Sequence, residues 1–133
     1  AKTDPNDVAE FIERTGCDLL AVSTVNVHGM DLSPNLVFPL LAEISTISKV
    51  PLVLHGGSGI PFDQVRQTRE KNLIKVNYGS DLRQAFIRTI GIAYEQNYNE
   101  FDLMSLSKES ISNVQDRVEG IIKWASYNWR WLL

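Results

Sequence analysis

Several features that define whole classes of protein are missing from this sequence. It has one cysteine, Cys17, so no disulfide can form within the chain, and its place just before an apolar run predicts a buried, unreactive thiol. No apolar run approaches the roughly 18–20 residues that span a bilayer, and the first residues do not resemble a secretory signal. The net charge of -3 offers no basic surface for nucleic acid. We therefore expect a soluble, cytoplasmic protein.

Short apolar runs alternate with helical patterns along most of the chain. Of the 133 residues, 44% are hydrophobic, which is enough for one core. Strands buried on both faces are expected at residues 19–22, 50–54 and 73–77. Helices are expected at residues 5–16, with Thr3 or Asp4 as N-cap, at 36–49, at 62–71 and from Leu82 onward. This alternation predicts an α/β fold with parallel strands, in which ligands bind at the carboxyl ends of the strands.

The pattern changes after Gln96. A polar loop follows, and Ser107 or Ser110 is expected to cap a last helix. The chain ends in an aromatic tail at residues 127–133, which could dock on its own domain or form a subunit contact.

Polar residues stand at the ends of the expected strands. His28 and His55 are the two histidines of the chain; each follows a strand pattern and precedes a glycine, and Asn77 ends the third strand. Neutral imidazole is a common zinc ligand, and a catalytic zinc usually has three protein ligands. His28 and His55 are therefore a candidate metal pair that lacks a third ligand. The alternative is that each histidine is a rim residue bonded only to backbone.

Two glycine-containing loops follow two of these strands. Gly56, Gly57, Ser58 and Gly59 could point several backbone N–H groups at one anion, and a helix is expected to begin just after them. Gly79 and Ser80 form a similar loop between a strand and a helix. Two such loops together favour a phosphate site, although either could be only a tight connection.

These motifs together resemble the C-terminal half of the class II zinc-dependent ketose-bisphosphate aldolases. The resemblance is carried by Val27-His28-Gly29, Leu54-His55-Gly56-Gly57-Ser58-Gly59 and Lys75-Val76-Asn77-Tyr78-Gly79-Ser80-Asp81, and it extends over nearly the whole chain. It implies a partial TIM (β/α)8 barrel. This chain would supply the last three βα units, at residues 1–97, and a C-terminal helical extension at 98–133, as part of one barrel domain.

The resemblance also implies the roles of individual residues. Zinc would be bound by His28 and His55, and a monovalent cation, Na+ or K+, by backbone carbonyls of Val27, Gly29 and Gly56. The substrate phosphate would lie on Gly56, Gly57, Ser58, Gly59, Gly79 and Ser80, with Asn77 contacting the bound ketose phosphate. The implied reaction is reversible cleavage of fructose or tagatose 1,6-bisphosphate to dihydroxyacetone phosphate and glyceraldehyde 3-phosphate, in a homo-oligomer (dimer or tetramer).

The chain also departs from the family pattern. It has no Asp-His pair, so the first zinc ligand and the aspartate that moves protons are expected in a missing N-terminal half of the barrel, and this chain alone is expected to be inactive. Met30-Asp31 replaces an aromatic–lysine pair, and a phosphate-binding arginine has only Lys108 as a loose counterpart. The alternative is a non-catalytic sugar-phosphate-binding or interaction module. An esterase is disfavoured, because no strand leads into a G-x-S-x-G elbow.

Overall fold

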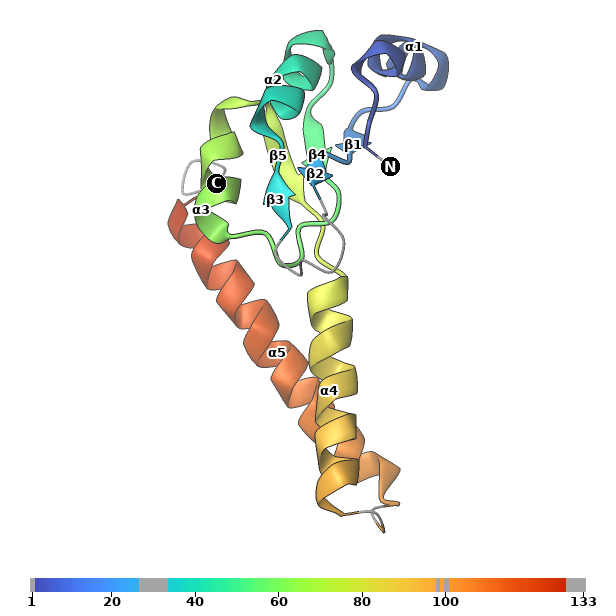
Figure 1. The fold of residues 1–133 in the computed structure, drawn as a ribbon, viewed down its shortest axis with the longest axis vertical. Coiled ribbons are helices and arrows are strands. Elements are labelled where there is room, and N and C mark those ends of the chain that lie inside the picture. The colour runs from blue at the N-terminus through green and yellow to red at the C-terminus, as the bar shows by residue number, and fades with distance from the viewer. Residues whose placement is uncertain (1, 27–33, 98, 100, 129–133) are drawn as a thin grey trace. The chain divides into compact units, whose positions relative to one another are not determined.

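The computed structural model describes residues 2–26, 34–97, 99 and 101–128, and Figure 1 shows the elements that they form. The chain divides into two compact units, Ala1–Tyr78 and Gly79–Leu133. We call them the sheet unit and the hairpin unit and describe each by itself. Among the described residues, no helix is both long and apolar enough to cross a membrane.

The sheet unit is built on three parallel strands. These are β1 (Leu20–Val22), β4 (Leu52–Leu54) and β5 (Leu73–Val76), in the order β1-β4-β5. In the register, Val22 lies beside Leu54 and Leu54 beside Val76. All three residues of β4 are buried. The three strands predicted from the apolar runs are thus confirmed, with β4 in the middle.

Helices connect these strands, as the sequence predicts. Asp4 caps α1 (Pro5–Thr15) by accepting a hydrogen bond from the Asn6 backbone N at 2.9 Å, and Gly16 ends the helix with a φ of 62°. In α2 (Phe38–Ile47), a proline is tolerated in the first turn. The next helix is shorter than predicted: α3 (Phe62–Gln67) passes into the 3-10 turn η1 (Thr68–Glu70).

One small sheet was not predicted. β2 (Val25–Asn26) pairs antiparallel with β3 (Asn35–Leu36). From the sequence, residues 31–35 are expected to form a polar turn region, and this was wrong for Asn35, which pairs with Asn26. Two-residue strands carry no periodicity from which they could be recognised.

The hairpin unit consists of two long helices, α4 (Ser80–Gln96) and α5 (Leu103–Asn128). The Asp81 carboxylate pairs with the Arg117 guanidinium at 2.8 Å, and Asn113 Nδ2 donates to Thr89 Oγ1, also at 2.8 Å. Asp81, near the start of α4, pairs with the later α5 residue Arg117, and Thr89, farther along α4, pairs with an earlier α5 residue. The two helices are therefore antiparallel.

The predicted cap of the last helix was wrong. Asp102 occupies that position, since its carboxylate accepts hydrogen bonds from the backbone N atoms of Met104 (3.0 Å) and Ser105 (3.2 Å). Ser107 and Ser110 lie inside α5, where the Ser110 hydroxyl donates to the Leu106 carbonyl at 2.8 Å. Most of the aromatic tail, residues 129–133, lies outside the described residues.

Candidate functional site

The carboxyl ends of β4 and β5 bring two of the predicted site residues together. The His55 backbone N donates to the Val22 carbonyl at 2.9 Å, and the Asn77 backbone N donates to the Leu54 carbonyl at 2.9 Å. The parallel ladder therefore continues just past the last strand residues. Val53 lies beside Lys75 in the register, so the alternation of side chains places His55 and Asn77 on that same face of the sheet. The His55 side chain is exposed and is available to a ligand.

The glycine loop after His55 is packed tightly against the end of β5. The Gly57 backbone N donates to the Asn77 carbonyl at 2.9 Å. A Cβ atom on Gly57 would collide with the Val76 side chain and lie 3.1 Å from the Asn77 oxygen. Gly56 and Gly59 have φ angles of 74° and 80°, which side chains rarely adopt. Glycine at these positions is thus required by the backbone path itself.

The helix after this loop contributes less than the sequence suggests. The Ile60 backbone N donates to the Gly57 carbonyl at 3.2 Å, which closes a turn before α3 begins at Phe62. α3 is only six residues long, so it has little dipole to direct at an anion. Anion binding at this loop would therefore depend on the backbone N–H groups of the loop.

The segment that carries the first histidine is anchored at its described end. Gln64 of α3 accepts a hydrogen bond from the Leu36 backbone N at 2.8 Å and donates to Asn35 Oδ1 at 2.7 Å. The Pro34 ring lies against the glycine loop, 3.0 Å from where a Cβ of Gly59 would be. His28, Val27 and Gly29 themselves lie outside the described residues. Their part in a metal or cation site therefore stays a prediction.

The described residues fit part of a metal site. An exposed imidazole at the end of a central strand is a suitable zinc ligand. Within residues 2–26, 34–97, 99 and 101–128, no three His, Cys, Asp or Glu side chains form a group that could hold a metal ion. A metal bound by His55 would therefore need ligands besides those that the described residues bring together.

The second predicted loop opens the hairpin unit. Gly79 is the N-cap of α4 and Ser80 is its first residue. The Arg83 backbone N donates to the Gly79 carbonyl at 3.1 Å, and its guanidinium Nη2 lies 3.4 Å from the Ser80 hydroxyl. Sequence reasoning did not single out this arginine. Its signal was the three-residue spacing from Ser80, which places both residues on one side of a helical turn.

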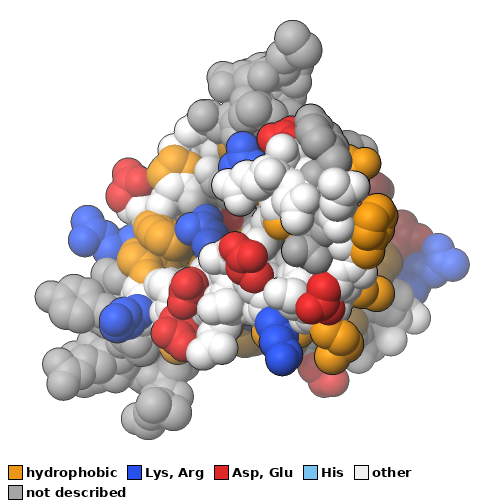
Figure 2. Space-filling model, turned by 90° about the horizontal axis from the view of Figure 1, so that it is seen from below, with side chains coloured by type: hydrophobic (Ala, Val, Ile, Leu, Met, Phe, Trp, Pro, Cys, Tyr) orange, Lys and Arg blue, Asp and Glu red, His pale blue; other side chains and the backbone are white. Residues whose placement is uncertain are grey.

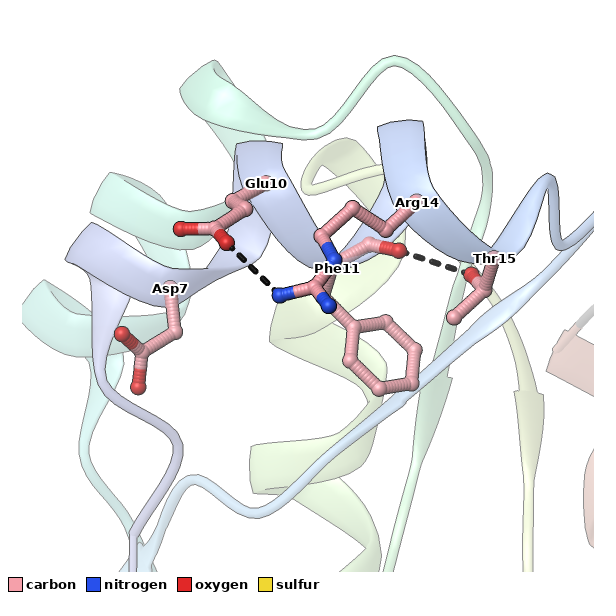
Figure 3. Close-up of a pocket in the computed structure, with 5 residues that line it drawn as sticks. All are labelled: Asp7, Glu10, Phe11, Arg14 and Thr15. Carbon is pink, nitrogen blue, oxygen red and sulfur yellow. Dashed lines mark hydrogen bonds and ion pairs between the residues drawn. The ribbon is translucent and has the colours of Figure 1, made fainter.

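The structure also has a depression away from these strand ends. It measures about 530 Å³ and is lined by one face of α1: Asp7, Glu10, Phe11, Arg14 and Thr15. Figure 3 shows the Glu10–Arg14 ion pair, 3.0 Å long, and the hydrogen bond from the Thr15 hydroxyl to the Phe11 carbonyl. Both interactions stay within the helix, so this is a shallow helix surface, and the strand ends remain the candidate site.

Comparisons with known proteins agree with this geometry. Residues 1–128 match the family described as fructose-bisphosphate aldolase class-II. Among solved structures, the chain is similar to the YdjI aldolase from Escherichia coli K12, with 34% identity, a TM-score of 0.67 and coverage of 92% of this chain and 44% of that chain. A fructose-bisphosphate aldolase from Campylobacter jejuni shares the fold at 22% identity, with a TM-score of 0.65 and the same coverages, 92% and 44%.

The chain therefore spans less than half the length of these solved structures. The match along its own length is nearly complete. The chain belongs to the class II fructose-bisphosphate aldolase family.

Proposed function

We propose that the complete protein is a zinc-dependent aldolase that reversibly cleaves a ketose 1,6-bisphosphate, of the fructose or tagatose type, to dihydroxyacetone phosphate and glyceraldehyde 3-phosphate. This chain would be the C-terminal part of its TIM barrel, with three βα units at residues 1–97 and a helical extension at 98–133. One observation carries the proposal. His55, its glycine loop and Asn77 meet at the carboxyl edge of a parallel sheet, in a chain of this family.

The metal would be held by His55 together with His28. Bound zinc would supply Lewis-acid polarisation of the substrate carbonyl. A further ligand and the aspartate that moves protons would come from the N-terminal half of the barrel.

The substrate phosphate would be bound mainly by backbone. The Gly57 N–H is donated to the Asn77 carbonyl, so the anion would be met by other N–H groups of the loop of Gly56, Gly57, Ser58 and Gly59, whose positive-φ glycines free the chain from side-chain clashes. Asn77 would orient the bound ketose phosphate from the adjacent strand end. Backbone carbonyls of Val27, Gly29 and Gly56 would hold a monovalent cation beside the phosphate.

The start of α4 would add a second set of phosphate contacts. α4 has 17 residues, so its N-terminus carries a substantial partial positive charge. Gly79 offers backbone, Ser80 a hydroxyl, and Arg83 an exposed guanidinium beside that hydroxyl. Arg83 would thus be the positively charged side chain that binds the substrate phosphate. In the sequence, Lys108 was only a loose candidate for this role.

The edges of the sheet support the proposal that this chain is part of a larger barrel. β1 and β5 each pair on one side only among the described strands. Unpaired strand edges are costly and prone to association. Strands of the N-terminal half would pair with these edges, and the isolated chain would be inactive.

The test compares the full-length protein with its His55→Ala variant. We expect loss of bound zinc, measured by mass spectrometry of the metal, and loss of retro-aldol cleavage in a coupled assay by at least about a hundredfold, as for a lost group in a metal site. Lys71→Ala, a change at the far end of β5, is the matched control and should keep both. Normal zinc content and activity in His55→Ala would overturn the proposal.

A second function is kept because the described residues hold no complete ligand group. A non-catalytic member of the family would still bind sugar phosphate at the glycine loop. Its binding of dihydroxyacetone phosphate, measured by calorimetry, would be unchanged by a zinc chelator. Weakened binding on chelation would favour the aldolase.

A further inference from the structure

The three-stranded sheet has two unlike faces. One face is buried and carries leucine and valine side chains: Leu20, Val22, Leu52, Leu54 and Leu73. The other apolar side chains buried in the sheet unit include residues of α1, α2 and α3, so helices cover this face. The alternation of side chains along the strands places six residues on the opposite face, which we call the site face: Ala21, Ser23, Val53, His55, Lys75 and Asn77.

The site face is largely uncovered in this chain. Val53, in the middle strand, is buried by its neighbours, whereas Ala21, His55 and Lys75 are exposed. Ser23 and Asn77 are half-buried. This face therefore differs from the helix-covered one in both exposure and polarity, and it includes the two strand-end residues of the candidate site.

Lys75 is the one residue of the site face that carries a formal charge at neutral pH. Among the described residues, none forms an ion pair with it. In Figure 2, Lys and Arg side chains at the surface lie among Asp and Glu side chains in contact with solvent. A charge in such surroundings needs no fixed partner. Lys75 would lose these surroundings if the site face became covered.

The position of Lys75 relates it to the candidate site. It lies two residues before Asn77 on β5 and beside Val53, which lies two residues before His55 on β4. Two strand residues span about 7 Å, which is close to the reach of an extended lysine side chain. The ammonium can therefore approach the level of His55 and Asn77 from the amino-terminal side, below the glycine loop.

Completion of the barrel would enclose Lys75. This chain covers 44% of the length of the YdjI aldolase, and the rest of a barrel would supply the missing strands. Alternate residues of each strand then face a packed interior. A buried ammonium without a partner is costly, and zinc bound at His55 would add further positive charge nearby. None of the six site-face residues supplies a negative charge, so a counter-charge would have to come from the N-terminal half.

We propose that Lys75 is a positioning residue whose ammonium pairs with an Asp or Glu carboxylate of the N-terminal half, at the floor of the barrel beneath the metal. The pair holds that carboxylate in place relative to His55. Lys75 does not contact the substrate phosphate, which lies above it on the glycine loop. The inference rests on the proposed function, because it requires the completed barrel.

The first test uses the full-length protein and three variants. Lys75→Met should lower both kcat and zinc affinity by about tenfold or more, as for a lost outer-shell partner of a metal site, and should change KM by less than about threefold. Lys75→Arg keeps the charge and should remain within about threefold of the wild type in kcat and zinc affinity. Lys71→Met is the matched control, since it makes the same change near the opposite end of β5 and should leave both values unchanged.

The second test does not depend on activity. In the zinc-free protein, Lys75→Met should lower the urea midpoint of unfolding more than Lys71→Met does, because it leaves a buried carboxylate unpaired. A crystal structure of the full-length wild type should show a carboxylate oxygen within about 4 Å of Lys75 Nζ. This structure also decides the matter if Lys75→Met does not fold.

Three results would overturn the inference. The crystal structure could show Lys75 Nζ with no carboxylate within that distance. Lys75→Met could keep the kcat and zinc affinity of the wild type. It could also raise KM alone, which would indicate a substrate contact. A wild type with neither zinc nor aldolase activity would instead overturn the proposed function, while the Nζ–carboxylate distance and the zinc-free unfolding would still decide the ion pair.

Discussion

In the sheet unit the side chains with no exposed surface include Leu52, Leu54 and Val22, whereas in the hairpin unit the most buried side chains are Thr89 and Ser110. None of the hairpin's described hydrophobic residues is as completely buried as the strand residues. The sheet unit is therefore stabilised mainly by burial of apolar surface, which supports a fixed rim for the site. The hairpin relies more on hydrogen bonds and on side chains that are only half-buried.

The largest expected effect of a substitution lies in the central strand. Leu54→Ala should lower the free energy of unfolding by about 2–5 kcal/mol, because it removes a fully buried side chain and leaves a cavity. Val118→Ala on the hairpin, where the side chain is half-buried, should cost about 1 kcal/mol. Urea unfolding of both variants measures the difference, and equal costs would mean that the two units are not stabilised differently.

The glycine loop tests how closely the site is packed on the sheet. Gly57→Ala should cost about 1–3 kcal/mol, because the new Cβ meets Val76 and the Asn77 carbonyl. Gly91→Ala provides the control, since no side chain or backbone outside its own helix lies within 4 Å of the added Cβ. We expect Gly91→Ala to stabilise α4 by a few tenths of a kcal/mol to about 1 kcal/mol. A Gly57→Ala variant as stable as the wild type would show that the loop can shift away from β5.

The start of α5 offers a test within the hairpin unit. Asp102→Ala should destabilise it by about 0.5–2 kcal/mol, because the carboxylate accepts from two backbone N–H groups of the first turn. Asp116→Ala makes the same change of charge at an exposed position in the middle of the helix and should cost less than about 0.5 kcal/mol. Thermal unfolding followed by circular dichroism would compare the two. Equal effects would mean that Asp102 acts through its charge alone.

The smallest expected effect concerns the polar pair between the helices. Asn113→Ala should cost about 0.5–1.5 kcal/mol, as for one hydrogen bond between neutral side chains. Thr89 keeps its bond to the Ala85 carbonyl at 2.9 Å, so its hydroxyl is not left without an acceptor. A double-mutant cycle with Thr89→Ala isolates the coupling between the two side chains. A coupling energy of zero would show that this pair does not help to set the register of the helices.

Much of the sheet unit could be predicted from the sequence, because continuous apolar runs and helix-ending residues carry strong local signals. Asp4, Pro5 and Gly16 defined α1, and His55 and Asn77 follow the ends of β4 and β5, as the apolar runs predicted. The shared site of the two histidines stays a prediction, since His28 lies outside the described residues.

Other features depend on contacts that the sequence does not reveal. The β2–β3 pair is too short to show a pattern, and it is held in part by Gln64, which lies on a later helix. Ser107, Ser110 and Asp102 are all suitable caps, and only the path of the loop determines which one is used. Arg83 was missed for a similar reason, because its three-residue spacing from Ser80 carries meaning only once the helix is known to begin at Ser80.

The most direct test of the central claim is an anomalous difference map, recorded at the zinc absorption edge, from crystals of the full-length protein. We predict a peak at the carboxyl ends of β4 and β5, about 2.0–2.1 Å from a ring nitrogen of His55, with His28 as a second ligand. A zinc peak elsewhere, with His55 bonded only to protein groups or solvent, would contradict the account.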